Sequence, residues 1–507
     1  MNFATGAFAF VFLPAALIIF HLARRIAGLR ASFFVLILLS AAFYASWRWQ
    51  YLALILATIV VNYFIGVWIQ STAGDTQRKL IITGSVSANL AVLGYFKYLD
   101  FLIENFALAT GLNLHTLGII LPLGISFFVF QQISYLIDCY RGDAGTRNFL
   151  DYALFVLFFP HMIAGPIVRA AILLPQFHRP LPESVTRLLG VGLAIFVFGL
   201  AKKLCLANPL ADIADPVFAA AKAGGQPLSA ASAISGTLAY SFQIYFDFSG
   251  YTDMAIGIAA MFGIKLPINF DSPYKARGII EFWRRWHISL SEWLRDYLYI
   301  PLGGSRKGAP RQYASLLITM LLGGLWHGAG WGFVIWGAIH GMALATEHAM
   351  RRGSTKRPWM IAVPTFLFVT LAWVFFRAET LSAAMAIFHA MTDFPDLSTV
   401  DWPDPAVIDW PNVAAEIARP EWRPWELLGF AGLIVWLMPN TNQIFVGTWP
   451  AFEMRSARVL EVLHASAPEW LSFKPNVAWG IVVGVMAYVA MRSSYLATPV
   501  PFIYFQF

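Results

Sequence analysis

The chain has 507 residues, of which 58% are hydrophobic and 12% are charged, and its formal net charge is +7. Soluble globular proteins carry about 25% charged residues, so this composition excludes an ordinary soluble enzyme and is typical of an integral membrane protein. Two cysteines are too few for a disulfide framework, and the standard nucleotide-binding and zinc-binding motifs are missing from the sequence. We therefore expect an all-α polytopic membrane protein that forms one domain over residues 1–507.

Apolar runs that approach the roughly 17–25 residues of a membrane-spanning helix recur along the chain. The first run has no basic region before it and no small-residue cleavage pattern after it, so we expect it to remain as a membrane helix rather than act as a secretory signal. The clearest runs cover residues 7–23, 32–46, 51–69, 80–95, 115–137, 361–376 and 477–490.

Basic residues predict which ends of these helices face the cytoplasm. Clusters at 24–30 and 78–79 follow the first and third runs, which puts both clusters inside and the N-terminus outside. The segment 273–312 holds eight basic residues against three acidic ones, so it too should be cytoplasmic. The loop 393–426 is acidic and has no lysine, and we expect it on the outer, periplasmic side.

The segment 313–350 must cross the membrane and return, because basic clusters at 273–312 and 351–357 flank it. Its length of about forty residues allows two short passes at ~1.5 Å per residue, with a turn near 328–332. His327 then lies at the outer end of a short hairpin or inside a re-entrant one. Glycine-broken backbone at membrane depth is tolerated where it is buried in protein or lines a cavity.

Next to Trp326 and among several glycines, His327 is the strongest candidate for chemistry. A neutral imidazole can accept a proton from a hydroxyl group and return it to a leaving group. A lone histidine on an apolar helix is also often a hydrogen-bonded core residue, and the residues alone leave both interpretations open.

We expect residues 281–300 to form one helix at the membrane interface, with Trp283 and His287 on the same face. Arg285, Trp286 and Arg295 add cations and indoles to this helix. Such a helix can be a plain interfacial anchor, and its basic charge could also attract an anionic donor.

Three further features carry polar groups. Asp247 and Asp253 lie in an aromatic, apolar stretch, and we expect them to pair with arginines of segment 277–295. Residues 158–169 combine two prolines with a glycine, which predicts a broken helix or a re-entrant loop. His340 and His348 have no third ligand at a fitting spacing, so we expect no metal site.

Five motifs in order along the chain resemble the membrane-bound O-acyltransferases, and most of all their alginate O-acetyltransferase subfamily. The teichoic acid D-alanyl transferases are similar at a greater distance. The resemblance runs from about residue 120 to 385 and rests on FFPHMIAGPIVR, YFDFSGYTDMAIG, NFDSPYKARGIIEFWRRWHISLSEWLRDYLYIPLGG, LLGGLWHGAGW and WVFFRAETLSAA.

This resemblance implies a fold of about eleven transmembrane helices around a thinned centre with short or re-entrant helices. It also implies catalytic roles for two histidines. His327 would act as general base on the acceptor hydroxyl, and His287 would orient or polarise the thioester. The substrate-binding residues expected around them are Trp283, Arg285, Trp286, Arg295, Asp296 and Trp326.

The expected reaction moves an acetyl group from acetyl-CoA or an acyl-carrier thioester to a hydroxyl of an exported, alginate-like polysaccharide. No bound cofactor, metal or nucleic acid is expected. The expected location is the bacterial inner membrane, in contact with lipid, with a periplasmic or membrane-anchored SGNH-type partner that finishes the modification. The alternatives are an acyl-group conduit or transporter, and a scaffold for a polysaccharide synthase that makes no bonds.

Overall fold

The computed structural model describes residues 2–143, 145, 148–179, 184–224, 228–351, 362–393, 423–448, 467–496 and 502–503. Within these ranges all regular structure is helical, which confirms the expected fold class. Most of the acidic loop 393–426 lies outside the described residues. The sidedness of the loops and the count of about eleven spans stay predictions.

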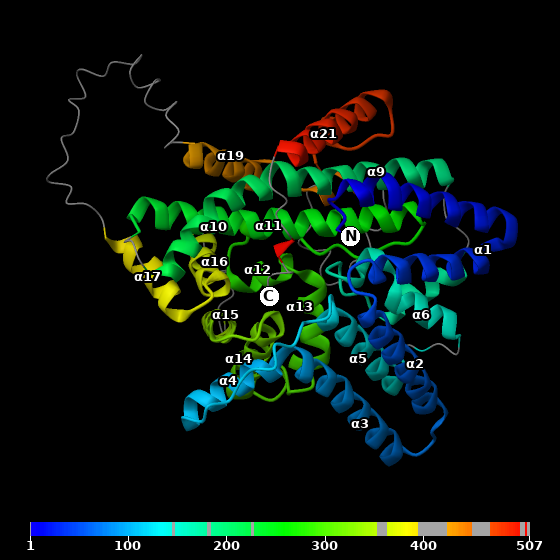
Figure 1. Ribbon diagram of the computed structural model, residues 1–507, viewed down its shortest axis with the longest axis horizontal. Coiled ribbons are helices and arrows are strands. Elements are labelled where there is room, and N and C mark those ends of the chain that lie inside the picture. The colour runs from blue at the N-terminus through cyan, green and yellow to red at the C-terminus, as the bar shows by residue number, and fades with distance from the viewer. Residues whose placement is uncertain are drawn as a thin grey trace.

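The first helix, α1 (Leu13–Ala45), follows a π-helical turn at Ala7–Phe12 and contains a sharp break. Gly28 has φ 85° and ψ −178°, and Figure 1 shows the chain turning back there. The two arms of α1 therefore correspond to the predicted runs 7–23 and 32–46. A positive φ costs little at glycine because it has no Cβ atom.

Two further helices follow as predicted, and a third starts later than expected. α2 is Gln50–Ser71 and α3 is Asp75–Leu93, followed by a π-helical turn at Gly94–Tyr98 and by α4 (Leu99–Thr110). The predicted helix over 115–137 is wrong in its first part, because α5 begins only at Ile125. Pro122 lacks an N–H group and Gly124 has φ 70°, so the helix cannot extend back through them.

The segment 158–169 is broken, as the sequence predicts. α6 (Phe149–Leu157) ends before Phe158, α7 (Phe159–Met162) is a single turn, and α8 (Ala170–Leu173) starts only after an irregular stretch. Nearly every side chain from 158 to 169 is buried. Irregular backbone of this kind is compatible with membrane depth when protein surrounds it.

A layer of long helices crosses the whole molecule in Figure 1. It consists of α9 (Val185–Ala201), α10 (Asn208–Ala223) and α11 (Ala230–Met261), with a π-helical turn at Lys202–Ala207 between α9 and α10. Glycines let α9 and α11 approach closely: a Cβ atom built on Gly257 would lie 2.5 Å from the carbonyl oxygen of Gly192. Most of α11 is buried, so this helix forms the centre of the fold.

The helices that lie under this layer in Figure 1 carry the candidate site. They are α12 (Ile279–Arg285), α13 (Ile288–Leu294), α14 (Ala309–His327), α15 (Trp331–Arg351), α16 (Ala362–Arg377) and α17 (Leu381–Thr392). The predicted hairpin is confirmed, because α14 and α15 pack against each other and are joined at residues 328–330.

In Figure 1, α19 (Arg423–Leu437) and α21 (Val477–Leu496) cover the outer side of the α9–α11 layer, and the short helix α20 (Thr441–Phe445) contacts α9. Near the C-terminus the chain returns to the core, where Phe502 stacks on Tyr251 with ring centroids 4.3 Å apart. The backbone N–H of Ile503 donates to Asp247.

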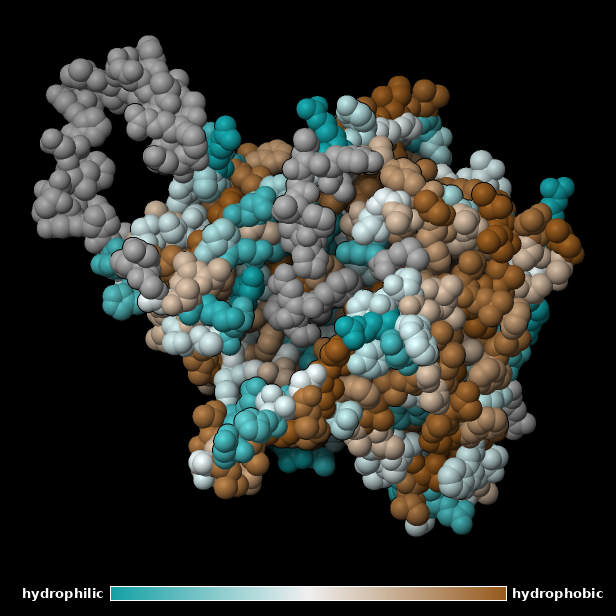
Figure 2. Space-filling view, in the orientation of Figure 1, coloured by the Kyte–Doolittle hydropathy of each residue, from teal (hydrophilic) through white to brown (hydrophobic). Residues whose placement is uncertain are grey.

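The outer surface has the apolar character of a membrane protein. Among the described residues, four helical segments are long and apolar enough to cross a membrane, and three apolar helices are shorter. Figure 2 shows apolar residues covering much of the right-hand side of the molecule, over α1 and its neighbours. Large side chains there, such as Ile26 with 75% exposure, have no protein partner to cover them. The long segments are Ala7–Ala45, Gln50–Ser71, Asp75–Thr110 and Val185–Ala223.

Candidate functional site

The α14–α15 hairpin places His327 on the last turn of α14, deep in the protein. The side chain of His327 is 4% exposed. Two glycines allow the arms of the hairpin to touch: a Cβ atom on Gly324 would collide with the carbonyl of Phe333, and one on Gly337 with the carbonyl of Met320. Small residues at such contacts are typical of helix pairs in membranes.

Lys97 and Tyr98 hold the end of α14 in place. The Lys97 ammonium donates to the carbonyl oxygens of Trp326 and, at 2.9 Å, of His327, while the Tyr98 hydroxyl donates to the carbonyl of Leu325 at 2.7 Å. The last carbonyls of a helix have no partner within the helix, and a cation there also interacts favourably with the helix dipole. These two residues thus cap the helix that presents His327.

His287 lies between α12 and α13, and the predicted single helix over 281–300 is wrong at this position. His287 has φ 42° and ψ 54°, a left-handed conformation that few residues other than glycine adopt. Two backbone hydrogen bonds to the segment 269–271 flank it, from Ile288 to the Asn269 carbonyl and from Asp271 to the Arg285 carbonyl, both at 2.9 Å. Trp283 and His287 consequently do not share a helical face.

The hydrogen bonds of Asn269 decide which nitrogen of His287 carries the proton. Asn269 Oδ1 accepts from the backbone N–H of Ser289 at 3.1 Å and from its hydroxyl at 2.9 Å, which identifies this atom as the carbonyl oxygen. His287 Nδ1 lies 3.1 Å from the same oxygen. Since a carbonyl oxygen only accepts, Nδ1 donates, and in the neutral ring Nε2 then carries a lone pair.

A further bond ties this network to the broken segment. The backbone N–H of Ile167 donates to the Ser289 hydroxyl at 2.9 Å. The irregular stretch 163–169 thus supports the residues that orient His287.

The structure brings the two predicted catalytic histidines together. Their ring centroids lie 6.4 Å apart, and the ring of Trp326 contacts both histidines, at 6.1 Å from His287 and 4.9 Å from His327. Trp336 and Phe376 complete the wall around His327, with ring centroids 5.3 and 5.1 Å away. The result is a buried imidazole pair in an aromatic box, which can accept and return a proton without competition from bulk water.

The indoles of Trp283 in α12 and of Trp286 directly after it form the next layer of rings. Trp283 donates its Nε1–H to His340 Nδ1 at 3.3 Å and packs on Trp336, with ring centroids 5.7 Å apart. Trp286 is 1% exposed and packs on Trp373 at 5.0 Å. Trp283 and Trp286 therefore lie within the protein core beside the histidines and not on an interfacial surface.

The charged residues predicted to bind substrate form ion pairs with neighbouring side chains. Arg285 is held by Glu281 and Asp271, and Arg295 bonds Asp296 at 2.6 Å. Burial raises the pKa of Asp296, but its bonds with Arg295 and Arg169 outweigh this effect and lower the pKa below its ordinary value. These ion pairs give the segment a fixed shape, and direct contact of its cations with a donor stays a prediction.

The expected partners of the two aspartates in α11 are wrong. Asp247 pairs with Lys203 at 3.0 Å and Asp253 with Lys202 at 2.6 Å, so the cations come from the π-helical turn Lys202–Ala207 instead of from segment 277–295. The glycine contact between α9 and α11 brings this turn next to α11. Both aspartates are nevertheless paired, as predicted, because an ionised group at membrane depth needs a partner.

The sequence analysis did not predict several residues of the site. Lys97 could have been predicted, since a lysine at the end of an apolar run is a candidate for function. Asn269 and Trp336 carry no such signal, because their roles arise from contacts with chain segments far away. His340 drew attention only as a possible metal ligand, and among the described residues no three metal-binding side chains come together.

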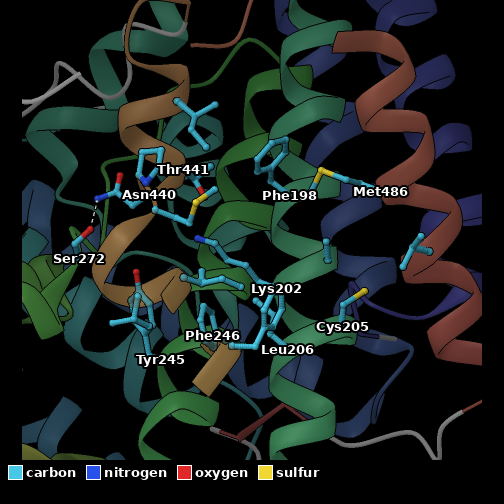
Figure 3. Close-up of a pocket in the computed structure, with 18 of the residues that line it drawn as sticks. Phe198, Lys202, Cys205, Leu206, Tyr245, Phe246, Ser272, Asn440, Thr441 and Met486 are labelled. Atoms are coloured by element: carbon cyan, nitrogen blue, oxygen red, sulfur yellow. Dashed lines mark hydrogen bonds between the residues drawn. The ribbon is translucent and has the colours of Figure 1, made fainter. Parts of the chain in front are cut away.

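A separate cavity of about 420 Å³ opens between α9, α11, α19 and α21, away from the histidines (Figure 3). Its walls are almost entirely apolar. The Lys202 ammonium at the cavity bonds Asp253, which also accepts from the Thr441 hydroxyl at 2.8 Å. Apolar lining residues include Phe198, Leu206, Phe430, Ile434, Val485 and Met486. The cavity offers volume for an apolar group, and its few polar side chains include Cys205 and Lys202.

Comparison with known proteins gives one family and several relatives. The model of the membrane-bound O-acyltransferase family, MBOAT, matches residues 125–384. The peptidoglycan O-acetyltransferase of Helicobacter pylori is 43% identical, covering 78% of this chain and 80% of its own length. The probable alginate O-acetylase AlgI of Azotobacter vinelandii is 46% identical, covering 78% and 79%. A teichoic acid D-alanyltransferase of Streptococcus thermophilus is 29% identical, covering 45% and 57%.

Proposed function

Because this chain belongs to the membrane-bound O-acyltransferase family, we propose that it transfers an acetyl group from a cytoplasmic thioester to a hydroxyl group of an exported polysaccharide. The buried pair of His287 and His327 is the single observation that carries this proposal, since the two rings meet in an aromatic box at the end of the α14–α15 hairpin. Relatives named as a peptidoglycan O-acetyltransferase and an alginate O-acetylase support acetyl as the group and a carbohydrate polymer as the acceptor.

His327 acts as the general base. It takes the proton of the acceptor hydroxyl as the oxygen attacks the thioester carbonyl, and it returns this proton to the thiolate that leaves. His287 has its Nδ1–H bonded to Asn269, so its Nε2 accepts hydrogen bonds and orients a substrate hydroxyl or thiol. In this neutral form His287 has no N–H at Nε2 with which to polarise the thioester carbonyl.

The donor is acetyl-CoA or an acyl-carrier thioester that approaches from the cytoplasmic side of the inner membrane, where the basic segment 273–312 attracts its negative charge. The acceptor approaches from the opposite side. A periplasmic or membrane-anchored SGNH-type partner completes the transfer to the polymer, which fits a chain whose described residues form membrane helices and their connections.

The decisive test replaces His327 with alanine in protein purified into lipid nanodiscs. Supplied with radiolabelled acetyl-CoA, with alginate or peptidoglycan fragments and with the SGNH-type partner, the wild type should release free coenzyme A and label the acceptor. The loss of a general base should lower kcat by about 10²–10⁴-fold in His327→Ala.

His389→Ala provides the matched control, because this exposed histidine of α17 lies outside the site and should leave the rate unchanged. Wild-type acetylation by His327→Ala would contradict the proposal. That result would instead favour an acyl-group conduit or a scaffold for a polysaccharide synthase.

A further inference from the structure

Two buried N–H groups next to His327 have no hydrogen-bond partner among the described residues. They are Nε1 of Trp336 and Nε2 of His340. Trp336 is 1% exposed and His340 is 0% exposed. A polar group that is buried without a partner is costly, and the cost is largest at membrane depth, so each such group in a native fold needs an explanation.

The hydrogen bond from Trp283 determines that His340 Nε2 is a donor. The indole N–H of Trp283 can only donate, and it points to His340 Nδ1 at 3.3 Å, so Nδ1 must carry the lone pair. In the neutral ring the proton is therefore on Nε2. The indole Nε1 of Trp336 is a donor by its nature, so the site contains two donors for which the described part of the chain provides no acceptor.

The two donors lie together on α15, four residues apart and thus on one face of the helix. The ring centroids of Trp336 and His340 are 4.7 Å apart, and the ring of Trp336 also contacts the ring of His327 at 5.3 Å. The imidazole of His327 can thus accept a proton, and a pair of hydrogen-bond donors lies beside it. An oxygen atom that gains negative charge is the ligand that fits such a pair.

We propose that the indole N–H of Trp336 and the Nε2–H of His340 form the donor pair that binds the carbonyl oxygen of the donor thioester. This inference rests on the proposed acyl transfer. It fills the role that His287 cannot take, since neutral His287 has its only N–H on Asn269.

The donor pair has a defined place in the reaction. The acceptor oxygen forms a bond to the carbonyl carbon, its proton goes to His327, and the electron pair of the C=O double bond moves onto the carbonyl oxygen. Trp336 and His340 stabilise this oxyanion. When the intermediate collapses, the C=O bond re-forms, the C–S bond breaks, and the thiolate takes the proton from His327.

Trp336→Phe tests the donor pair, because it retains an aromatic ring and removes the N–H. We expect kcat to fall by about 10²-fold, as for the loss of one oxyanion donor, while KM for acetyl-CoA changes by less than about threefold. His340→Leu should lower kcat to a similar extent as Trp336→Phe. His340→Gln should recover part of the rate, since its amide can accept from Trp283 and also donate.

Trp373→Phe is the matched control. Its ring stacks on Trp336 at 5.6 Å, but its N–H already donates to the Tyr274 hydroxyl at 3.2 Å. We expect its kcat loss to be less than about tenfold. All variants are compared at equal amounts of folded protein, as judged by thermal unfolding.

The outcome also separates this inference from the proposed function. If wild-type protein transfers acetyl groups and His327→Ala does not, but Trp336→Phe and Trp373→Phe have equal kcat, the donor pair is wrong and the proposed function stands. A change in KM without a change in kcat would also overturn the donor pair. Wild-type protein that transfers no acetyl group would overturn both.

Discussion

The pair of His287 and Asn269 shows how one hydrogen bond determines the chemistry of an imidazole. Asn269 Oδ1 accepts from His287 Nδ1 and from both donors of Ser289, so the ring can neither rotate nor change tautomer without loss of these bonds. The family resemblance implied that His287 orients or polarises the thioester. Its hydrogen bonds make Nε2 an acceptor, which agrees with an orienting role.

Asn269→Ala should therefore lower both activity and stability. Removal of the shared acceptor leaves buried donors unpaired, at about 1–3 kcal/mol each, and releases the tautomer of His287. We expect kcat to fall by at least about tenfold per folded molecule, measured with acetyl-CoA and the acceptor that supports the wild type.

Asn62→Ala is the control for this prediction, because Asn62 is also buried and bonds Asn89 and Gln132 far from the histidines. It should lower the unfolding temperature without lowering the kcat of the folded protein. Equal kcat in Asn269→Ala and the wild type would show that the tautomer of His287 is irrelevant to the reaction.

Among the helices, α14 matters most for function because its last residue is His327. Three carbonyls at this end, of Leu325, Trp326 and His327, accept from Lys97 and Tyr98. The donors come from the point where the π-helical turn Gly94–Tyr98 follows α3, so a distant helix determines where α14 ends.

Lys97→Met should loosen the end of α14. A hydrogen bond from a charged group contributes about 1.5–3 kcal/mol, so we expect lower thermal stability together with a lower kcat at unchanged KM for the donor. Lys97→Gln should recover part of both, because the amide can still donate. Lys79→Met, at an exposed lysine of α3, should change neither quantity. If Lys97→Met behaves like Lys79→Met, Lys97 does not position His327.

The single helix predicted over 281–300 is divided at His287 into α12 and α13. Residues 279–294 have no proline, so the sequence predicts a continuous helix. The left-handed His287 is held by hydrogen bonds to residues 269–271. Such a conformation costs about 1–3 kcal/mol and persists only when its surroundings enforce it, as is common at functional sites.

The molecule as a whole depends on the contact of α9 with α11. Gly192 faces Gly257, and Gly199 faces Gly250, so two glycine pairs one above the other let the backbones touch. This contact also brings Lys202 and Lys203 to the aspartates of α11. Close packing and buried polar pairs take the place of the hydrophobic effect, which does not drive helices together inside a membrane.

Gly192→Ala should therefore destabilise the fold. Its Cβ atom would lie 2.6 Å from the Gly257 carbonyl oxygen and 2.5 Å from the Met261 side chain, so the helices must separate, at about 1–3 kcal/mol. Gly190→Ala is a matched control in the same helix, because nothing lies within 4 Å of its Cβ atom. It should be neutral or stabilise by about 0.5–1 kcal/mol through helix propensity. Thermal unfolding in detergent compares the two, and equal shifts would contradict this account of the α9–α11 contact.

Hydropathy and charge along the chain were sufficient to predict an all-α membrane protein, several of its helices, among them α2, α3 and α16, and the α14–α15 hairpin. These properties follow from the local sequence, because membrane depth admits few backbone conformations. The motifs were also sufficient to predict the family, and they singled out the two histidines that the fold brings together. The break at His287, the cations that pair with Asp247 and Asp253, and the tautomers of His287 and His340 all depend on residues far apart in sequence. They are decided by packing, since a hydrogen bond or an ion pair exists only where the fold brings its two partners within reach.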